Sequence, residues 1–263
     1  MWCRRGGLGG RIVEWGSALV TGASRGLGAF IARRLGADGW PVGVNYPPGV
    51  PAERERAAKV VADVGAAGGE AEAVAADVTD EEQVRELVAQ TAAALGPIEV
   101  LVVNATGPQP VIALEELTWR AHLDQLEFFV KSPTLLVQAA LPAMKRRGGG
   151  RIVQVGSDMP ERALRGWSAY AGAKAAQLSL TRVWARELGP YGITVNLVAP
   201  GWIPVERHAD AMPQERDGYL AGVPLGRFGT PQDIAGAVSY LASDAARFIT
   251  GARLPVNGGE VFG

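Results

Sequence analysis

The sequence has few of the side chains that build metal centres and disulfide frameworks. Among its 263 residues there is one cysteine, Cys3, and there are two histidines, His122 and His208. A single cysteine excludes a disulfide within the chain, and so few ligands make no credible His/Cys metal cluster. We therefore expect no metal site, and we expect both histidines to be ordinary surface or loop residues.

Long apolar runs and a strong net charge are also absent. No apolar stretch approaches the about 20 residues that cross a bilayer. Residues 1–16 contain paired arginines with no apolar stretch after them, which predicts a flexible extension and not a secretory signal. The formal net charge of −1 gives no electrostatic case for binding nucleic acid or an anionic membrane. The composition predicts a cytoplasmic protein that acts on a small molecule, with no nucleic-acid or membrane partner.

What the chain does contain is a phenol and an amine that one helix would present together. Tyr170 and Lys174 are four residues apart in a predicted helix, so they share one face. A phenol is a poor acid or base at neutral pH, but a neighbouring ammonium lowers the pKa of a phenol toward the working range. Such a spacing also arises by chance on solvated helices, and its meaning depends on the other motifs.

A second motif near the N-terminus is typical of a phosphate cradle. Gly22, Gly26 and Gly28 follow a predicted apolar strand and precede a helix that begins near Leu27. In such a turn the glycines allow a tight bend, close approach of the backbone to a pyrophosphate and close packing of helix on strand. The alternative is a glycine cluster without a ligand, in a chain that has 35 glycines.

Strands and helices alternate along the whole chain. The pattern predicts an α/β fold of the Rossmann type: one domain over residues 17–263, with a doubly wound, seven-stranded parallel sheet and helices on both faces. Ligands of such sheets bind at the carboxyl ends of the strands. The predicted strands are 18–21, 42–46, 72–76, 100–104, 152–156, 194–199 and 253–257, and the clearest helices are 28–38, 53–67, 81–95, 167–188 and 231–243.

Taken together, these motifs resemble those of the short-chain dehydrogenase/reductase family. Residues 21–28, the pair Asn104 and Ala105 after a strand, and Pro200 with Gly201 lie in that family's order. Ser157 lies 13 positions before Tyr170, where the family keeps a serine. The resemblance runs from about residue 17 to residue 259, and the chain is most similar to the 3-oxoacyl-[acyl-carrier-protein] reductase-like branch.

The resemblance implies a role for each of three side chains. Tyr170 would give a proton to a carbonyl oxygen as hydride reaches the carbon, Ser157 would hold that oxygen, and Lys174 would bind the nicotinamide ribose and support the tyrosine. The predicted reaction is NADP(H)-dependent reduction of a ketone to a secondary alcohol, the ketone being a 3-oxoacyl thioester or a polyketide-like secondary metabolite.

Two alternatives remain at this point. One is a sugar or polyol dehydrogenase that works in the oxidative direction. The other is a non-catalytic dinucleotide-binding sensor or scaffold, because a fold does not dictate a function. Such a protein would not need Ser157, Tyr170 and Lys174 together, and their joint presence favours an enzyme. A serine hydrolase is disfavoured because Ser157 lacks the G-x-S-x-G context.

The end of the second predicted strand bears on the choice of cofactor. Asn45 and Tyr46 stand where an acidic residue would accept from ribose hydroxyls, and Arg25 can offer a fork to a 2′-phosphate. NADP(H) is therefore preferred and NAD(H) is possible, although Arg25 can also be read as a solvated loop charge. The predicted cofactor contacts are Thr21, Gly22, Ser24, Arg25, Gly26, Leu27, Gly28, Asn45, Tyr46, Asp77, Val78, Asn104, Ala105, Tyr170, Lys174, Pro200, Gly201 and Ile203.

Asp77 has a second interpretation. It resembles the family residue that contacts the adenine, but it can equally be the cap of the helix that follows.

Residues 202–223 fall where the family places a mobile substrate lid. Trp202 and Tyr219 are candidates to stack on a flat ketone, and Arg207 or His208 to meet an anionic group, but surface packing explains them nearly as well. The identity of the substrate does not follow from this segment.

One departure from the family pattern lies in the helix after the fourth strand. Many relatives have an asparagine there whose backbone carbonyl holds a water linked to the lysine. In this chain the equivalent position is Phe129 when counted back from residues 138–142, and Leu126 when counted forward from Trp119. Pro133 nearby predicts a local kink, and Val205 stands where a threonine commonly binds the carboxamide. One interpretation is that a backbone contact tolerates the side-chain change. Our hypothesis is that Phe129 walls an apolar substrate pocket while the proton path runs from the lysine through water to a backbone carbonyl.

The helix predicted at 167–188 carries a stripe of apolar residues. The stripe offers more apolar surface than one sheet face requires, which predicts a helix-to-helix interface. Proteins that the chain resembles usually form homotetramers through this helix, and we expect the same here. The stripe comprises Ala169, Ala173, Ala176, Leu180 and Trp184.

Overall fold

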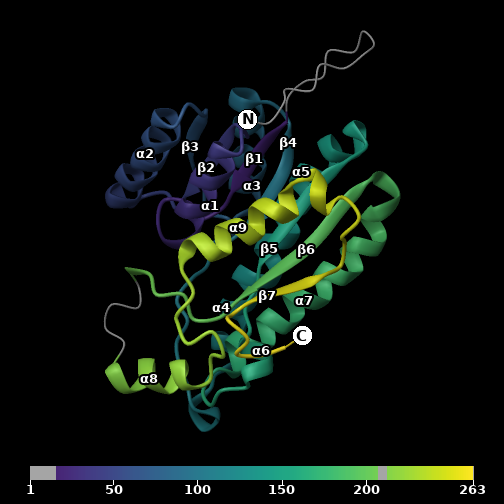
Figure 1. The fold of residues 1–263 in the computed structure, drawn as a ribbon. Coiled ribbons are helices and arrows are strands. Elements are labelled where there is room, and N and C mark those ends of the chain that lie inside the picture. Colours follow the sequence, from purple (N-terminus) through teal and green to yellow (C-terminus); the bar gives the residue numbers. More distant parts are fainter. Residues whose placement is uncertain (1–15, 207–211, 263) are drawn as a thin grey trace.

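The computed structural model describes residues 16–206 and 212–262 and shows a single parallel sheet (Figure 1). Its strand order is β3-β2-β1-β4-β5-β6-β7, which is a doubly wound arrangement of the type that the sequence predicts. The order reverses between β1 and β4, so a crevice opens at the carboxyl ends of these strands. The strands are β1 (Ser17–Val20), β2 (Val42–Tyr46), β3 (Ala71–Ala75), β4 (Ile98–Val103), β5 (Gly150–Val155), β6 (Ile193–Pro200) and β7 (Arg253–Val256).

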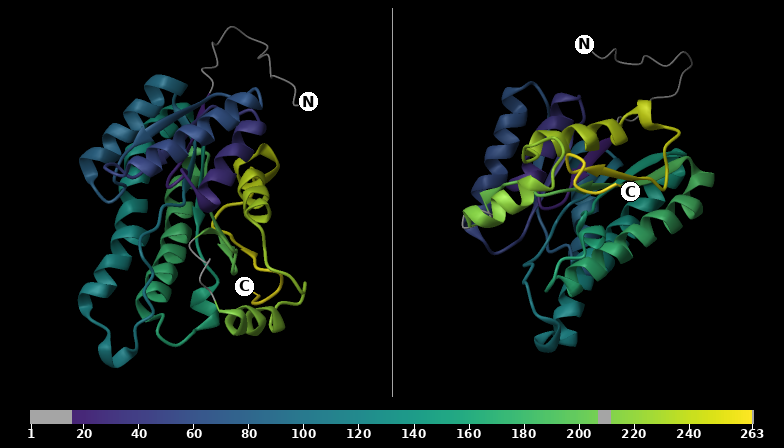
Figure 2. Two further views of the ribbon diagram at one scale, coloured as in Figure 1. Left: turned by 90° about the vertical axis from the view of Figure 1, so that its left-hand side faces the viewer. Right: turned by 60° about the horizontal axis from the view of Figure 1, so that its bottom comes forward.

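Helices cover both faces of this sheet (Figure 2). One core cluster joins α1, α2 and α9 to the sheet, and a second joins α3, α5 and α7 to the other face. The helices are α1 (Gly26–Ala37), α2 (Pro51–Ala66), α3 (Glu81–Leu95), α4 (Trp119–Leu126), α5 (Ser132–Arg147), α6 (Met159–Arg162), α7 (Ser168–Leu188), α8 (Pro213–Ala221) and α9 (Pro231–Ala242).

The two core clusters follow from the alternation of side chains along each strand. In β1, Ala18 and Val20 belong to the cluster under α1 and α9, while Leu19 between them belongs to the cluster under α3 and α5. All three are fully buried. Because both faces of a parallel sheet are covered, every residue of β1 is buried.

Local signals set the ends of several helices. The Asp80 carboxylate accepts a hydrogen bond from the Gln83 amide at 2.9 Å and caps α3, and Gly96 follows that helix with a φ of +88°. Asp77, for which this cap was one interpretation, instead accepts from the Thr79 amide and hydroxyl within its own turn. The helix cap is therefore Asp80.

Most predicted boundaries are shifted by one or two residues. The first strand begins at Ser17 instead of residue 18, and the fourth begins at Ile98 instead of residue 100. Gly16, assigned by the sequence to a flexible extension, is buried, and a side chain there would overlap Glu99. Residues 1–15 of that extension lie outside the described part of the chain.

Part of the apolar stripe on α7 is buried against other elements of the same chain. Ala169 is 8% exposed and Ala173 is 1% exposed, so neither is available to a partner. Trp184 packs against the core cluster under α3 and α5. The prediction that the whole stripe forms an interface is therefore wrong for Ala169 and Ala173, and the homotetramer stays a prediction.

Within residues 16–206 and 212–262, no helix is both long and apolar enough to cross a membrane. Nor do three or more His, Cys, Asp or Glu side chains there gather in a way that would hold a metal ion.

Candidate active site

Tyr170 and Lys174 lie on one face of α7, close to the end of β5. Their side chains are buried, with residue exposures of 7% and 5%. The Lys174 ammonium donates to the Val155 carbonyl at 2.8 Å and to the Gln177 side-chain oxygen at 3.0 Å. Since Val155 ends β5, the first of these bonds ties the lysine to the strand that leads to Ser157. The helix and the strand thus bring the predicted proton-handling pair to the carboxyl edge of the sheet.

Ser157 lies in the turn between β5 and α6. Its Oγ accepts a hydrogen bond from the Met159 amide at 3.1 Å, which fixes the turn that starts α6. The hydroxyl proton is not used in this contact, because the oxygen is the acceptor. Ser157 is half-buried and keeps a donor for a carbonyl oxygen.

Two aromatic side chains flank the tyrosine. The Phe129 ring meets the Tyr170 ring edge to face, with centroids 5.4 Å apart and planes at 88°, and Trp167 packs 5.5 Å away. Phe129 lies on η2 (Glu127–Lys131), a π-helical segment between α4 and α5. Pro133 opens α5 immediately after this segment. The irregularity that the sequence predicted near Pro133 is thus a π turn that holds Phe129 against the tyrosine.

The glycine-rich turn connects β1 to α1 at the crevice. Gly22 has a φ of +60° and Gly26 a φ of +51°, conformations that side chains rarely adopt. At Gly28 a Cβ would overlap the Gly22 carbonyl and would lie 2.6 Å from the Asn104 side-chain nitrogen. Bare backbone therefore lines the turn at the N-terminus of α1, where the helix dipole favours an anion.

The turns after β1 and β4 are tied to each other. The Asn104 amide donates to the Thr21 hydroxyl at 2.9 Å, and its side chain donates to the Thr21 and Gly22 carbonyls at 2.9 and 3.1 Å. The Ala105 amide donates to the same hydroxyl at 3.1 Å. These bonds hold the two sides of the crevice at a fixed separation.

Asn45 lies beneath the glycine turn. It is 2% exposed, and its side-chain oxygen accepts from the Gly22 amide at 3.1 Å while its nitrogen donates to the Ala76 carbonyl at 3.1 Å. The amide at this position therefore shapes the turn. Tyr46, the next residue, is half-buried and ends β2.

A cluster of cations surrounds the outer side of the glycine turn. A pocket of about 200 Å³ lies there. Glu53, 6% exposed, accepts from the Ser24 hydroxyl at 2.5 Å and pairs with Arg25 at 3.2 Å. The Arg25 side chain is 54% exposed, so its pairing leaves part of it facing solvent. The pocket is lined by Ser24, Arg25, Gly26, Ala29, Phe30, Arg33, Arg56, Lys59 and Glu206.

The charges around this pocket favour an anion. Four of the lining side chains are cationic and one, Glu206, is anionic. Asp63 pairs with Arg33 at 2.9 Å and with Lys59 at 3.1 Å, and these partners lower the pKa of the Asp63 carboxyl. With Glu53 and Asp63 counted, one positive charge remains in excess.

The other predicted cofactor residues lie around the same edge. Val78 is 5% exposed and Ile203 is 4% exposed, and both are buried at strand ends. Pro200 is the last residue of β6, and Gly201 packs against the Tyr219 hydroxyl. Leu27 packs against the core from the first turn of α1.

The segment predicted as a lid, residues 202–223, contains the short helix α8, and two of its aromatic rings pack with Phe228 just beyond it. The Trp202 amide donates to the Tyr219 hydroxyl at 2.9 Å, and the two rings are 5.5 Å apart. Phe228 stacks on Tyr219 at 5.4 Å. Burial raises the pKa of the Tyr219 phenol. Arg207 and His208 lie outside the described residues.

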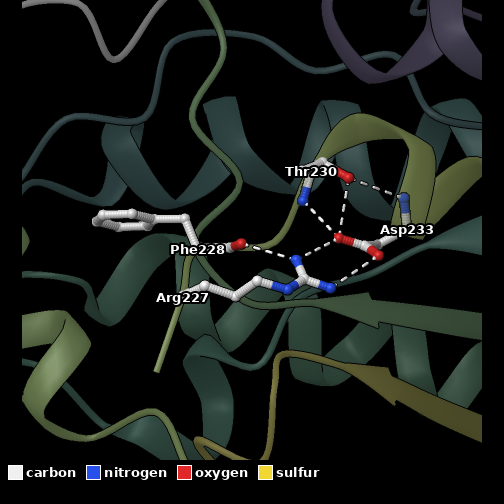
Figure 3. A network of polar contacts seen from close by, with 4 residues as sticks. All are labelled: Arg227, Phe228, Thr230 and Asp233. Carbon is white, nitrogen blue, oxygen red and sulfur yellow. Dashed lines mark hydrogen bonds and ion pairs between the residues drawn. The ribbon is translucent and has the colours of Figure 1, made fainter. Parts of the chain in front are cut away.

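A polar network holds Phe228 in this position (Figure 3). Arg227 donates to the Phe228 carbonyl at 2.9 Å and to the Asp233 carboxylate at 2.8 Å, and Asp233 also accepts from the Thr230 amide at 2.7 Å. These bonds hold the pKa of the Asp233 carboxyl well below its usual range. Thr230 caps α9, so the network ties the backbone of Phe228 to the start of that helix.

Asp158, which follows Ser157, belongs to a buried ionic cluster that the sequence did not suggest. It is 1% exposed, and burial raises the pKa of its carboxyl to about 6, with Glu260 raising it further and Arg162 opposing the shift. Arg162 pairs with Glu260 at 3.3 Å, and Arg253 pairs with Glu161 at 2.7 Å. One signal for this cluster was available: a carboxylate directly after the turn that follows a largely buried strand.

The raised pKa of Asp158 predicts how stability depends on pH. The usual pKa is 3.8, so between that value and about 6 the folded protein binds more protons than the unfolded chain. Its stability then falls as the pH rises through this window. Asp158→Asn stays neutral, and we expect it to gain about 3 kcal/mol relative to wild type between pH 3.5 and pH 8. Urea unfolding of both proteins at the two pH values measures this. A stability difference between variant and wild type that is the same at both pH values would contradict the raised pKa of Asp158.

Sequence reasoning also missed Glu53 and Gln177. Each is polar, and each lies on a helix where a solvated position is the ordinary expectation. The signal for Glu53 was its place in the first turn of a helix that begins with Pro51. The signal for Gln177 was its position three residues after Lys174, on the same helix face.

Comparison with known proteins decides the family. The family described as Enoyl-(Acyl carrier protein) reductase matches residues 22–260. The 3-oxoacyl-[acyl-carrier-protein] reductase of Staphylococcus aureus strain Mu50 is 39% identical over 246 residues, which are 92% of this chain and 97% of the relative. The chain belongs to the short-chain dehydrogenase/reductase family.

Further relatives and solved structures are similar to this chain over nearly its whole length. The 3-oxoacyl-[acyl-carrier-protein] reductase of Escherichia coli K12 is 37% identical over 244 residues, covering 92% of this chain and 96% of the relative. Among solved structures, a blue fluorescent protein from a metagenomic library in complex with NADPH is 39% identical with a TM-score of 0.86, covering 94% of this chain and 98% of that one. A Serratia marcescens short-chain dehydrogenase/reductase mutant is 36% identical with a TM-score of 0.86, covering 93% and 97%.

As a short-chain dehydrogenase/reductase, the chain is a nucleotide-binding oxidoreductase with a Rossmann fold. The family resemblance predicted from the sequence is confirmed. Membership in this family of oxidoreductases favours an enzyme over the non-catalytic sensor or scaffold. The individual roles of Ser157, Tyr170 and Lys174 stay predictions.

Proposed function

We propose that this enzyme uses NADPH to reduce a ketone to a secondary alcohol. The observation that carries the proposal is the placement of Tyr170 and Lys174, buried on one face of α7 and tied through the Val155 carbonyl to the strand that leads to Ser157. A 3-oxoacyl thioester is the first ketone to test, because the relatives from S. aureus and E. coli are named for that substrate.

The residues around the crevice fit a dinucleotide. The positive φ values of Gly22 and Gly26, and the lack of room for a Cβ at Gly28, leave backbone at the N-terminus of α1 for a pyrophosphate. The pocket beside Arg25 has the charge and the position for a 2′-phosphate. NADPH, when bound, supplies the hydride that adds to the carbonyl carbon.

Three side chains then carry the proton and the developing charge. The Tyr170 hydroxyl gives its proton to the carbonyl oxygen, so that the carbon gains hydride and the oxygen gains a proton. The Ser157 hydroxyl donates a hydrogen bond to the same oxygen and stabilises the charge that develops on it. The Lys174 ammonium, held by the Val155 carbonyl, favours the phenolate left behind.

The pocket at Arg25 predicts a preference for NADPH over NADH. In Arg25→Ala we expect kcat/KM for NADPH to fall by about tenfold to a hundredfold, because a charge-assisted hydrogen bond to phosphate is lost, while kcat/KM for NADH changes little. Steady-state rates with both cofactors measure this. Arg34→Ala is the matched control, since Arg34 is on the same helix and pairs with Asp38 at 2.9 Å. Equal kcat/KM values for the two cofactors in the wild-type enzyme would contradict the preference.

The function itself is tested by a panel of ketones and alcohols. Oxidation of NADPH is followed with β-ketoacyl thioesters, quinones, cyclic ketones and sugars, and reduction of NADP⁺ with polyols. Turnover of a ketone with NADPH is the expected result. Turnover of a polyol alone would instead favour a dehydrogenase that works in the oxidative direction.

A further inference from the structure

The Lys174 ammonium is enclosed by three groups of this chain. Two are oxygens, those of Val155 and Gln177, at 2.8 and 3.0 Å. The third is the ring of Phe129, whose centroid is 3.8 Å from the Lys174 nitrogen. Because the lysine is 5% exposed, these groups stand in for much of the water that would otherwise solvate the charge.

The contact with Phe129 has the geometry of a strong cation–π interaction. A cation within about 6 Å of a ring centroid is attracted by the negative face of the ring, and the attraction grows when water is excluded. Phe129 is 2% exposed, so its ring is as dry as the lysine it faces. The next ammonium-to-ring distance around the site, from Lys174 to Tyr170, is longer at 5.8 Å.

The same ring is in contact with the tyrosine. Phe129 and Tyr170 meet at 88° with centroids 5.4 Å apart. One side chain therefore touches both members of the predicted proton-handling pair. Its position depends on the backbone, because Phe129 lies on the π-helical segment Glu127–Lys131, and such wide turns are frequent at functional sites.

We propose that Phe129 is a positioning residue: its ring face holds the Lys174 ammonium beside Tyr170 through a cation–π interaction. The inference depends on the proposed function, since it assigns Phe129 to the lysine and tyrosine of that mechanism. It differs from the hypothesis that Phe129 walls a substrate pocket, because the ring then acts on the lysine and not on the substrate. A ring that only fills space would tolerate any change that keeps its shape.

Fluorinated phenylalanines at position 129 separate these roles. One, two and three fluorines progressively weaken the negative ring face and change the shape of the side chain little. We expect kcat/KM to fall in order of fluorination, by about tenfold in total, and the midpoint of the pH–rate profile to move in the same order. The same series at Phe128, whose ring packs against Gly107, is the matched control and should give no graded response.

A readout without turnover tests the contact itself. In protein labelled with ¹³C-lysine, the ε-methylene signal of Lys174, assigned from Lys174→Arg, should lie upfield because the ring of Phe129 faces it. In Phe129→Leu the signal should return toward the position of other lysines. This measurement stands even if no ketone is reduced, so failure of the proposed function and failure of this inference are distinguishable.

Either of two results would overturn the inference. One is a Lys174 signal that shows no upfield shift in the wild-type protein. The other is an active enzyme whose kcat/KM and pH midpoint are the same for all fluorinated variants, which would leave Phe129 as a packing residue only.

Discussion

Tyr170→Phe should lower kcat for ketone reduction by about 10²–10⁴-fold, because the enzyme loses the acid that protonates the carbonyl oxygen. The affinity for NADPH should change little. Tyr170 is 7% exposed and its ring packs against Phe129 and Trp167, contacts that a phenylalanine ring can also make. The fold should therefore be unchanged. Steady-state kinetics and a fluorescence titration with NADPH measure the two quantities separately.

Tyr191→Phe is the matched control for this variant. Tyr191 is 43% exposed, and its ring faces the Lys145 ammonium at 4.0 Å, a contact that phenylalanine retains. We expect wild-type rates. If Tyr170→Phe kept a rate near that of wild type, the tyrosine would not be the proton donor.

A second large effect is expected from Gly28→Ala. The added Cβ would overlap the Gly22 carbonyl and lie 2.6 Å from the Asn104 side-chain nitrogen, so the glycine turn or the Asn104 tie must move. Overpacking of this kind costs about 1–3 kcal/mol of folding free energy. Because the turn is the proposed cradle of the pyrophosphate, we expect NADPH affinity to fall at least tenfold as well, given that 1.4 kcal/mol corresponds to about a factor of ten.

Gly236→Ala separates this effect from the general consequence of changing a helical glycine. Gly236 lies within α9, and a Cβ there meets nothing within 4 Å. Alanine favours a helix over glycine by about 1 kcal/mol, so the control should be as stable as wild type or more stable. Urea unfolding and NADPH titration compare the two variants. Unchanged NADPH affinity in Gly28→Ala would contradict the proposed cradle.

Local signals explain how much of the fold the sequence predicts. The helix 81–95 is predicted with its observed ends, which Asp80 and Gly96 set within the local sequence, although the residue considered from the sequence as its cap was Asp77. The strand that begins at Ile98 was predicted to begin two residues later. Its true start depends on pairing with Ser17 in β1, a contact between residues far apart in the chain. Boundaries set by such partners do not follow from periodicity.

In the candidate site, too, the features set by local sequence were predictable and those set by contacts between distant elements were not. The spacing of Ser157, Tyr170 and Lys174 reflects one strand end and one helix face, and it is visible in the sequence. Contacts between distant elements are not: Glu53 lies beneath Arg25, and the Phe129 ring faces Lys174, only because α2 and η2 pack where they do.

Two side chains that the sequence assigned to ligands are buried in the protein itself. The Asn45 side chain, expected near the ribose, is 2% exposed. It accepts a hydrogen bond from the Gly22 amide and donates one to the Ala76 carbonyl. The Tyr219 hydroxyl, a candidate for contact with substrate, accepts from the Trp202 amide at 2.9 Å. A polar or aromatic residue at a strand end can stabilise a turn as well as bind a ligand, and its hydrogen-bond partners decide between these roles.

Isotopic labelling shows most directly whether hydride passes from NADPH to the ketone carbon. The wild-type enzyme is incubated with NADPH that carries deuterium at both positions of the nicotinamide C4 and with the ketone that the panel selects, and the product is analysed by mass spectrometry. We predict a secondary alcohol that carries one deuterium on the carbinol carbon, formed by the wild-type enzyme and at least about a hundredfold more slowly by Tyr170→Phe. An alcohol without deuterium, or no alcohol from any ketone while NADPH binds, would contradict the account.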